Sequence, residues 1–168
     1  EYIKESFVHP GKLFYFSSKR LFSIEFYSSG KAQWVKSPQE LNELLKNTKV
    51  IAVVGLSDKP SRPSYDVAHY MQQAGYKIIP VNPQCRTILG ETCYPDLASI
   101  PEKVDMVNVF RKPEDCFEVA KDAVKIGAKS LWLQLGIVNQ EAAQFAESHG
   151  LTVVMDRCIK VDHRNLNY

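Results

Sequence analysis

A polar loop at residues 55–64 carries the side chains best suited to chemistry in this chain. It offers the hydroxyl groups of Ser57 and Ser64 and the cations of Lys59 and Arg62, just ahead of a helical pattern. Hydroxyl donors, cations and the positive end of a helix dipole together favour a ligand with several phosphates. A purely structural interpretation also exists, in which Lys59 and Arg62 are solvated charges and Ser64 is only the helix N-cap.

A strand and a helix must position this loop. Residues 50–54 form a short, β-branched apolar run, which is typical of a strand buried on both faces, and Gly55 ends it. The spacing of apolar residues then predicts a helix from about residue 64 to 74, with Gly75 as its stop signal. Strand, turn, polar loop and helix make the first βα unit of a doubly wound α/β domain. Such folds bind nucleotide-like ligands at this junction.

The rest of the chain predicts an α/β, Rossmann-like, mostly parallel five-stranded sheet with helices on both faces. Further strands are predicted at residues 76–81, 104–110, 130–135 and 151–155. Further helices are predicted at residues 37–47, 113–126 and 139–148. Ser37 and Glu40 have the spacing of a capping box, and Asn139 is the expected N-cap of the last of these helices. Residues 88–94 are expected to form an irregular turn with a short helix or strand edge, and Asp162 to Arg164 are interpreted as a solvated tail.

We expect two parts: an N-terminal extension at residues 1–36 and one α/β domain at residues 37–168. The first 36 residues hold six Lys or Arg, three Glu and nine aromatic residues without a stable period. The first methionine is Met71, so residues 1–34 are interpreted as a variable extension or as sequence upstream of the true start. No function is assigned to them.

Composition narrows the class of protein. No apolar run approaches the roughly 20 residues that cross a bilayer, and no signal peptide is recognisable. The four cysteines form no CxxC pair and no zinc-like spacing. We therefore expect a cytoplasmic protein with reduced thiols, no metal and no membrane partner. A net charge of +2 gives no indication of nucleic-acid binding.

Two common nucleotide motifs are missing. A dinucleotide-binding unit has G-x-G-x-x-G after its first strand and an acidic residue at the end of its second strand. Residues 55–60 read GLSDKP and residues 81–83 read VNP, so only the first glycine matches and no carboxylate is present. An NAD(P)-binding oxidoreductase or redox-sensing domain is therefore disfavoured but stays an alternative. A Walker loop is also absent, which argues against ATP or GTP hydrolysis.

The outline V-G-L-S-x-x-P-x-R-x-S at residues 54–64 is followed by Val-Asn-Pro at 81–83. This order of motifs resembles the small stand-alone CoA-binding proteins, a family related to the CoA-binding domain of the succinyl-CoA synthetase α subunit. The further matching motifs are Leu89-Gly90, Cys93-Tyr94-Pro95, Ile100-Pro101, Val109-Phe110-Arg111-Lys112-Pro113, Gly127-Ala128-Lys129, Trp132-x-Gln134 and Asp156-Arg157-Cys158. Together they span about residues 40–163 in the order of the family.

The resemblance implies that coenzyme A lies across the carboxyl ends of the strands. By position, Gly55, Leu56 and Ser57 would approach the phosphates, with Lys59 and Arg62 as charge partners. Ser64 would contribute its hydroxyl at the start of the helix.

The ends of the second and third strands would hold the rest of the ligand. Asn82 and Pro83 would lie where a dinucleotide binder places its ribose acid, and a carboxylate there would repel the 3′-phosphate of coenzyme A. Phe110, Arg111 and Lys112 would pack against adenine and add positive charge. Phe110 has an equal interpretation as a core or rim aromatic residue.

No complete catalytic constellation is visible. The synthetase uses a phosphorylated histidine on a second domain, and none of the four histidines here is paired with an obvious nucleophile or acid. Cys158 is the one weak catalytic candidate, because the adjacent Arg157 would favour its thiolate and allow a mixed disulfide with the CoA thiol. Its alternative is a partly buried small residue.

We therefore expect a module that binds coenzyme A or an acyl-CoA, as a sensor or accessory, without evident catalysis. Three alternatives remain open. They are the NAD(P)-binding or redox-sensing domain, a CoA-binding component of a multi-subunit acyl-CoA ligase, and a thiol-dependent enzyme that uses Cys158.

Overall fold

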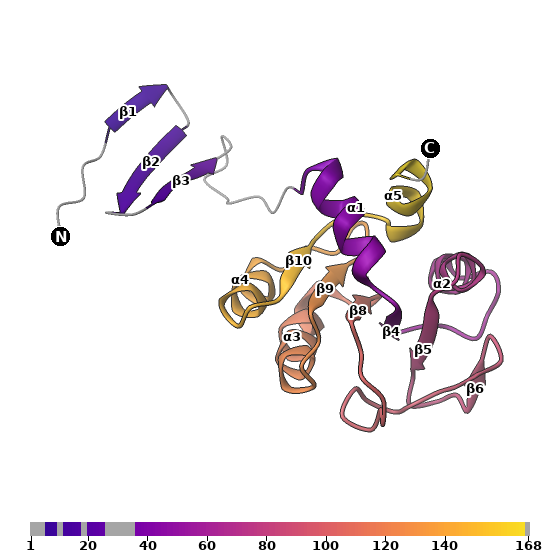
Figure 1. Ribbon diagram of the computed structural model, residues 1–168. Coiled ribbons are helices and arrows are strands. Elements are labelled where there is room, and N and C mark those ends of the chain that lie inside the picture. Colours follow the sequence, from indigo (N-terminus) through magenta and orange to yellow (C-terminus); the bar gives the residue numbers. More distant parts are fainter. Residues whose placement is uncertain (1–5, 10–11, 18–19, 26–35, 167–168) are drawn as a thin grey trace. The chain divides into compact units, whose positions relative to one another are not determined.

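The chain divides into two units, residues 1–35 and 36–168. The computed structural model describes residues 6–9, 12–17, 20–25 and 36–166. In the first unit, three strands form an antiparallel sheet in the order β1-β2-β3 (Figure 1). Their bounds are β1 (Ser6–His9), β2 (Lys12–Ser17) and β3 (Arg20–Glu25). The sequence predicted only an extension of unknown structure here, so these strands are an addition to the prediction.

The second unit is built on a parallel five-stranded sheet with the order β10-β9-β8-β4-β5. The strands are β4 (Val50–Val54), β5 (Lys77–Val81), β8 (Met106–Val109), β9 (Ser130–Leu133) and β10 (Thr152–Val154). This confirms the predicted Rossmann-like α/β fold. The chain leaves β4 toward β5 on one side and returns to β8 on the other, so the switch point at which such sheets bind ligands lies at the carboxyl end of β4.

Helices cover both faces of this sheet (Figure 1). On one face, α5 packs against α1 and α2, and on the other α3 packs against α4. The helices are α1 (Pro38–Asn47), α2 (Pro63–Gln73), α3 (Cys116–Lys125), α4 (Gln140–Ser148) and α5 (Ile159–Leu166). Strands β8 and β9 are buried along their whole length, as expected for a sheet covered on both faces.

Two predicted helix starts are confirmed. The Ser37 hydroxyl accepts from the Glu40 N–H at 3.2 Å, and Glu40 accepts from the Ser37 N–H at 2.7 Å, which completes the capping box. The Asn139 side chain accepts from the Ala142 N–H at 2.9 Å at the start of α4. These local signals were readable because each involves residues only three positions apart.

Two details differ from the sequence-based expectations, and a third agrees with the strand edge that was expected in one turn. Helix α2 begins at Pro63 with Arg62 as its N-cap, so the interpretation of Ser64 as N-cap is wrong. Proline at the first helical position lacks only an N–H that would have no helical partner, which explains the earlier start. The segment Pro113–Asp115 forms a 3₁₀ turn before α3. The expected irregular turn contains a small hairpin of β6 (Thr87–Ile88) and β7 (Glu91–Thr92).

The predicted solvated tail is wrong as well, because residues 162–164 belong to α5. Asp162 is only 7% exposed and accepts two hydrogen bonds from the Arg157 guanidinium, at 2.7 and 2.6 Å. The polar composition of this segment gave no sign of a helix. In the structure, the buried carboxylate of Asp162 is neutralised by Arg157 from the preceding loop.

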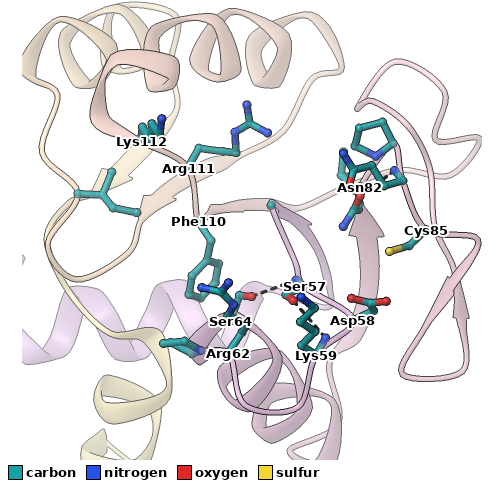
Figure 2. A pocket seen from close by; sticks show the side chains of 16 residues that line it. Ser57, Asp58, Lys59, Arg62, Ser64, Asn82, Cys85, Phe110, Arg111 and Lys112 are labelled. Atoms are coloured by element: carbon teal, nitrogen blue, oxygen red, sulfur yellow. Dashed lines mark hydrogen bonds between the residues drawn. The ribbon is translucent and has the colours of Figure 1, made fainter.

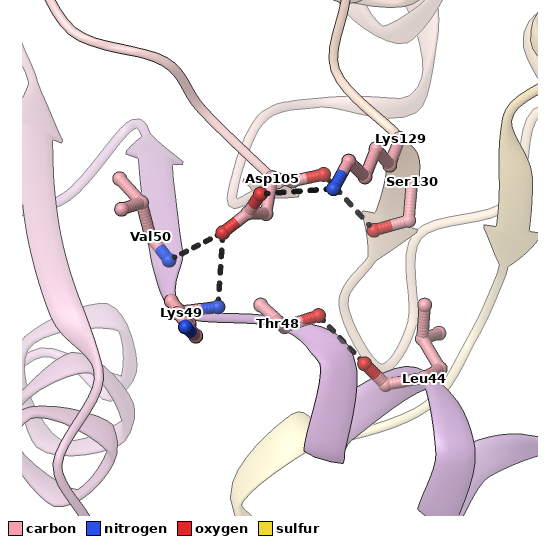
Figure 3. Close-up of polar contacts among 7 residues, drawn as sticks. All are labelled: Leu44, Thr48, Lys49, Val50, Asp105, Lys129 and Ser130. Carbon is pink, nitrogen blue, oxygen red and sulfur yellow. Dashed lines mark hydrogen bonds and ion pairs between the residues drawn. The ribbon is translucent and has the colours of Figure 1, made fainter.

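Asp105 fixes the amino edge of the sheet (Figure 3). Its Oδ2 accepts from the N–H groups of Lys49 and Val50, both at 3.0 Å, and its Oδ1 lies 3.7 Å from Lys129 Nζ. Burial acts to raise the pKa of this carboxyl, but the two N–H donors and the ammonium group outweigh it and hold the pKa below its usual value. Because these residues lie at the starts of β4, β8 and β9, one carboxylate links the amino ends of three strands.

Candidate functional site

A cavity of about 910 Å³ lies at the carboxyl ends of β4, β5 and β8 (Figure 2). This is the switch-point edge of the sheet, and the volume is within the range of ligand-binding pockets. The structure brings nearly all of the predicted site residues to its walls. These are Gly55, Ser57, Lys59, Arg62, Ser64, Asn82, Pro83, Phe110, Arg111 and Lys112.

Gly55 allows three strand ends to converge on the cavity. Its N–H donates to the Val81 carbonyl at 3.1 Å, and the Phe110 N–H donates to the Val54 carbonyl at 2.8 Å. Gly55 has a φ of +84°, and a Cβ atom at this position would lie 2.3 Å from the Phe110 carbonyl oxygen. A side chain would therefore meet both an unfavourable backbone conformation and a backbone atom that cannot move away. Gly55 is the only residue of this loop that matches a glycine of the G-x-G-x-x-G pattern, and this crossing of strands requires it.

The loop after Gly55 is held by its own serines (Figure 2). The Ser57 N–H donates to Ser64 Oγ at 3.0 Å, and the Lys59 N–H donates to Ser57 Oγ at 3.1 Å. The Arg62 N–H closes the next turn on the Lys59 carbonyl at 3.0 Å. Each serine oxygen thus accepts a backbone bond, while its hydroxyl hydrogen remains able to donate to another acceptor. The serines shape the loop and can still serve a ligand.

Lys59 and Arg62 are exposed cations at this loop. Within the part of the chain that the structure describes, neither side chain forms an ion pair. Arg62 is the N-cap of α2 and Lys59 lies three residues before it, where the helix dipole adds positive potential. Their charges are therefore available to an anion in the cavity.

Asn82 lines the cavity but uses both ends of its amide within the protein. Its Nδ2 donates to the Leu56 carbonyl at 3.0 Å, and its Oδ1 accepts from the Gln84 N–H at 2.8 Å. The side chain therefore ties the end of β5 to the turn after β4. Leu56 is the exception among the predicted residues, because its side chain is fully buried in the core and does not line the cavity.

The end of β8 supplies the opposite wall. Phe110 packs against the hydrophobic core and also lines the cavity, so both of its predicted roles fit its position. In Figure 2 its ring points toward the loop that carries Arg62 and Ser64, while Arg111 and Lys112 extend away from it. Arg111 lies 3.3 Å from the Asp115 carboxylate, which leaves Lys112 as the less engaged cation on this wall.

Other lining residues were not predicted, namely Asp58, Pro63, Val81, Gln84, Cys85 and Ile137. Cys85 lies beside Asp58, and burial together with the carboxylate raises the pKa of its thiol. Its position three residues after Asn82 would have suggested a place at the same strand end. Ile137 follows β9, whose carboxyl end shares this edge of the sheet, so the strand order was needed to find it.

Cys158 does not line the cavity. It is partly buried and packs against the core, and the neighbouring Arg157 guanidinium is bound to Asp162. This position fits the interpretation of Cys158 as a partly buried small residue. Cys85 is the cysteine at the cavity wall.

Two negative findings concern the described residues alone. Their His, Cys, Asp and Glu side chains form no group of three or more that could hold a metal ion. Their helices include none long and apolar enough to cross a membrane.

The site and fold have clear relatives. A family model described as a CoA binding domain matches residues 49–164. The uncharacterized protein YneT of Bacillus subtilis is 47% identical over 127 residues, which cover 76% of this chain and 94% of that protein. An ADP-forming acetate–CoA ligase II of Archaeoglobus fulgidus is 31% identical over 101 residues, which cover 59% of this chain but 15% of the ligase.

The solved structures agree with this grouping. A hypothetical protein from Pyrococcus horikoshii OT3 superposes with a TM-score of 0.78 and 36% identity, over 82% of this chain and 99% of that chain. A relative of nearly the same extent as the second unit therefore has the same fold.

Proposed function

Because this chain belongs to the family of CoA-binding domains, we propose that it binds coenzyme A or an acyl-CoA in the cavity at the carboxyl ends of β4, β5 and β8. The observation that carries the proposal is the charge of the walls. Among the described residues, the charged side chains that line the cavity are four cations and one carboxylate, a net charge of +3. Such a cavity favours a ligand with several phosphate groups, as coenzyme A is.

The loop after β4 is the proposed phosphate site. Lys59 and Arg62 supply charge, the Ser57 hydroxyl can donate a hydrogen bond, and the N-terminus of α2 adds the dipole. The ammonium group acts as a point charge, and the guanidinium can bind two phosphate oxygens at once. The diphosphate of coenzyme A would lie against these groups.

The adenosine is proposed to lie between the ends of β5 and β8. Pro83 and Phe110 offer apolar surface to the base, and Arg111 and Lys112 add positive charge for the ribose phosphate. Asn82 acts by holding the strand end in place, since its amide is already bonded within the protein. Asp58 is the one carboxylate on the walls, and the four cations outweigh its repulsion.

We propose a binding role without catalysis, in the cytoplasm. The thiol that lies beside a carboxylate on the cavity walls is Cys85, next to Asp58, and burial together with that carboxylate raises its pKa, which disfavours the nucleophilic thiolate. A second candidate, a CoA-binding component of an acyl-CoA ligase, is favoured by the similarity to the A. fulgidus ligase. Since the match covers 15% of that enzyme, such a role would require other protein parts to supply the chemistry.

The test is calorimetric titration with CoA, acetyl-CoA, NAD and NADP of the natural chain and of the Lys59→Ala and Arg62→Ala variants. We expect CoA to bind, each variant to weaken binding, and affinity to rise at low salt. Lys103→Ala is the matched control, because Lys103 is exposed and lies outside the cavity. Saturating CoA at about 100 times its Kd should add about 2.7 kcal/mol to the free energy of unfolding.

Two results would contradict the proposal. Binding of NAD without CoA would move the protein to the NAD(P)-binding class. Binding of none of the four ligands would remove the basis for a nucleotide site.

A further inference from the structure

Building on the proposed binding of coenzyme A, we propose that the loop after β9, residues 135–138, receives the acyl chain of a bound acyl-CoA. We call this segment the apolar loop. It gives the protein a preference for CoA thioesters with an apolar acyl group of medium length over free CoA. The preference is a further property of the site, because phosphate binding at the loop after β4 does not require it.

The apolar loop exposes side chains that water solvates poorly. Leu135 is 65% exposed and Val138 is 46% exposed. In the part of the chain that the structure describes, the one other large hydrophobic side chain that is exposed is Val161, at 41%. Ile137, between the two, lines the cavity. The two exposed side chains therefore flank, along the chain, a residue that lines the proposed ligand site.

Hydrogen bonds hold the apolar loop in this exposed position. The Gly136 N–H donates to Asp156 Oδ1 at 2.7 Å, and the Ile137 N–H donates to the Gln134 carbonyl at 2.9 Å. At the end of the loop, the Asn139 side chain donates to the Pro113 carbonyl at 2.8 Å. These bonds oppose a collapse of the apolar side chains onto the domain surface.

Asp156 makes its bond from a turn-like backbone conformation. Its φ is +58°, and Leu89 is the only other non-glycine residue with a positive φ among the described residues. Aspartate is one of the residues that tolerate this region, and here its carboxylate accepts the Gly136 N–H. Asp156 therefore helps to hold the apolar loop.

The polarity of the cavity walls indicates the direction of the ligand. With the diphosphate at Lys59 and Arg62, coenzyme A has two arms that leave in different directions. At the β5 end of the cavity, Asn82 and Gln84 surround the Pro83 surface proposed for adenine, whereas the β9 end presents the aliphatic side chain of Ile137. The thioester arm, which ends in the apolar acyl chain, matches the β9 end.

The experiment titrates the full chain with adenosine 3′,5′-bisphosphate, CoA and octanoyl-CoA. For the natural chain we expect octanoyl-CoA to bind about tenfold more tightly than CoA, since each buried methylene contributes. Leu135→Ser and Val138→Ser should reduce that ratio to below about threefold without changing the affinity for the bisphosphate. Val161→Ser is the matched control, because it removes an exposed apolar side chain from α5 and should leave the ratio intact.

The outcomes separate this inference from the proposed function. Equal affinity for CoA and octanoyl-CoA, or a ratio that survives both serine variants, would overturn the role of the apolar loop while CoA binding stands. Failure of all three ligands to bind would instead overturn the proposed function and this inference with it. Because Leu135 and Val138 are exposed, thermal unfolding should show that both variants remain folded.

Discussion

The Ser57 N–H and the Ser64 Oγ lie 3.0 Å apart, and this hydrogen bond closes the loop that carries Lys59 and Arg62. Ser64 is 6% exposed, so its hydroxyl is a built-in part of the loop and not a surface group. The distance between the two cations of the proposed phosphate site thus depends on a serine in the first turn of α2.

Ser64→Ala should weaken both the fold and ligand binding. The Ser57 N–H would lose its partner, at a cost of about 1 kcal/mol in the free energy of unfolding. The loosened loop should lower the affinity for CoA several-fold. Urea unfolding and calorimetry measure the two effects, and Ser61→Ala, at an exposed position of the same loop, is the control. An unchanged CoA affinity in Ser64→Ala would show that the loop does not depend on this bond.

Gly55→Ala and Gly75→Ala separate backbone conformation from steric conflict. Both glycines have a positive φ, +84° and +103°, but a Cβ would lie 2.3 Å from the Phe110 oxygen at Gly55 and meet nothing within 4 Å at Gly75. Gly75→Ala should cost about 1–2 kcal/mol of stability. Gly55→Ala should cost clearly more and abolish CoA binding, as urea unfolding and titration would show. Equal losses in the two variants would argue against the close crossing at Phe110.

Asp105→Asn should alter the response to acid. The pKa of Asp105 in the folded chain lies below its unfolded value of about 3.9, so its contribution is complete above that pH and is lost as the pH falls through the lower folded pKa. At pH 7 we expect a loss of about 1–3 kcal/mol, because a neutral amide accepts the Val50 and Lys49 N–H groups less strongly than the carboxylate and gives up the weaker attraction to Lys129. Urea unfolding between pH 7 and pH 3 should show a smaller difference between the two proteins at the acidic end. A difference that stays constant over this range would contradict the assignment.

Cys116 should resist alkylation while the protein is folded. The thiol is fully buried, and burial raises its pKa to about 11. Since the thiolate is the reactive form, iodoacetamide at pH 8 should modify Cys116 only in denaturant. Mass spectrometry of tryptic peptides measures this directly. Fast modification of Cys116 in the native protein would show that α3 opens readily.

Local patterns carried much of the fold prediction. The apolar runs gave the strands, and the capping residues Ser37 and Asn139 gave two helix starts, because these signals act over a few residues. The polar sequence of α5 gave no such signal. Its helix depends on tertiary partners, since Asp162 is satisfied by Arg157 and Ile159 is buried in the core.

The site divides in the same way. The loop after Gly55 could be predicted, because its residues are consecutive and precede a helix. The role of Asn82 as an internal tie and the burial of Leu56 could not, because both depend on how β4 and β5 meet. Ile137 was missed because its place at the cavity follows from the position of β9 in the sheet.

The packing of α1 against α5 couples the folding and the local unfolding of the first and last helices of the domain. Leu41 and Leu45 of α1 are buried in the same core as Ile159 of α5, although the family match begins only at residue 49. These contacts join segments more than a hundred positions apart. Forming them closes a long loop and reduces the entropy of the chain, so the contacts should form late in folding. When α1 or α5 detaches from the core, the other helix loses its packing partner. The two helices should therefore unfold locally as one cooperative unit, and proteases should cleave both at similar rates.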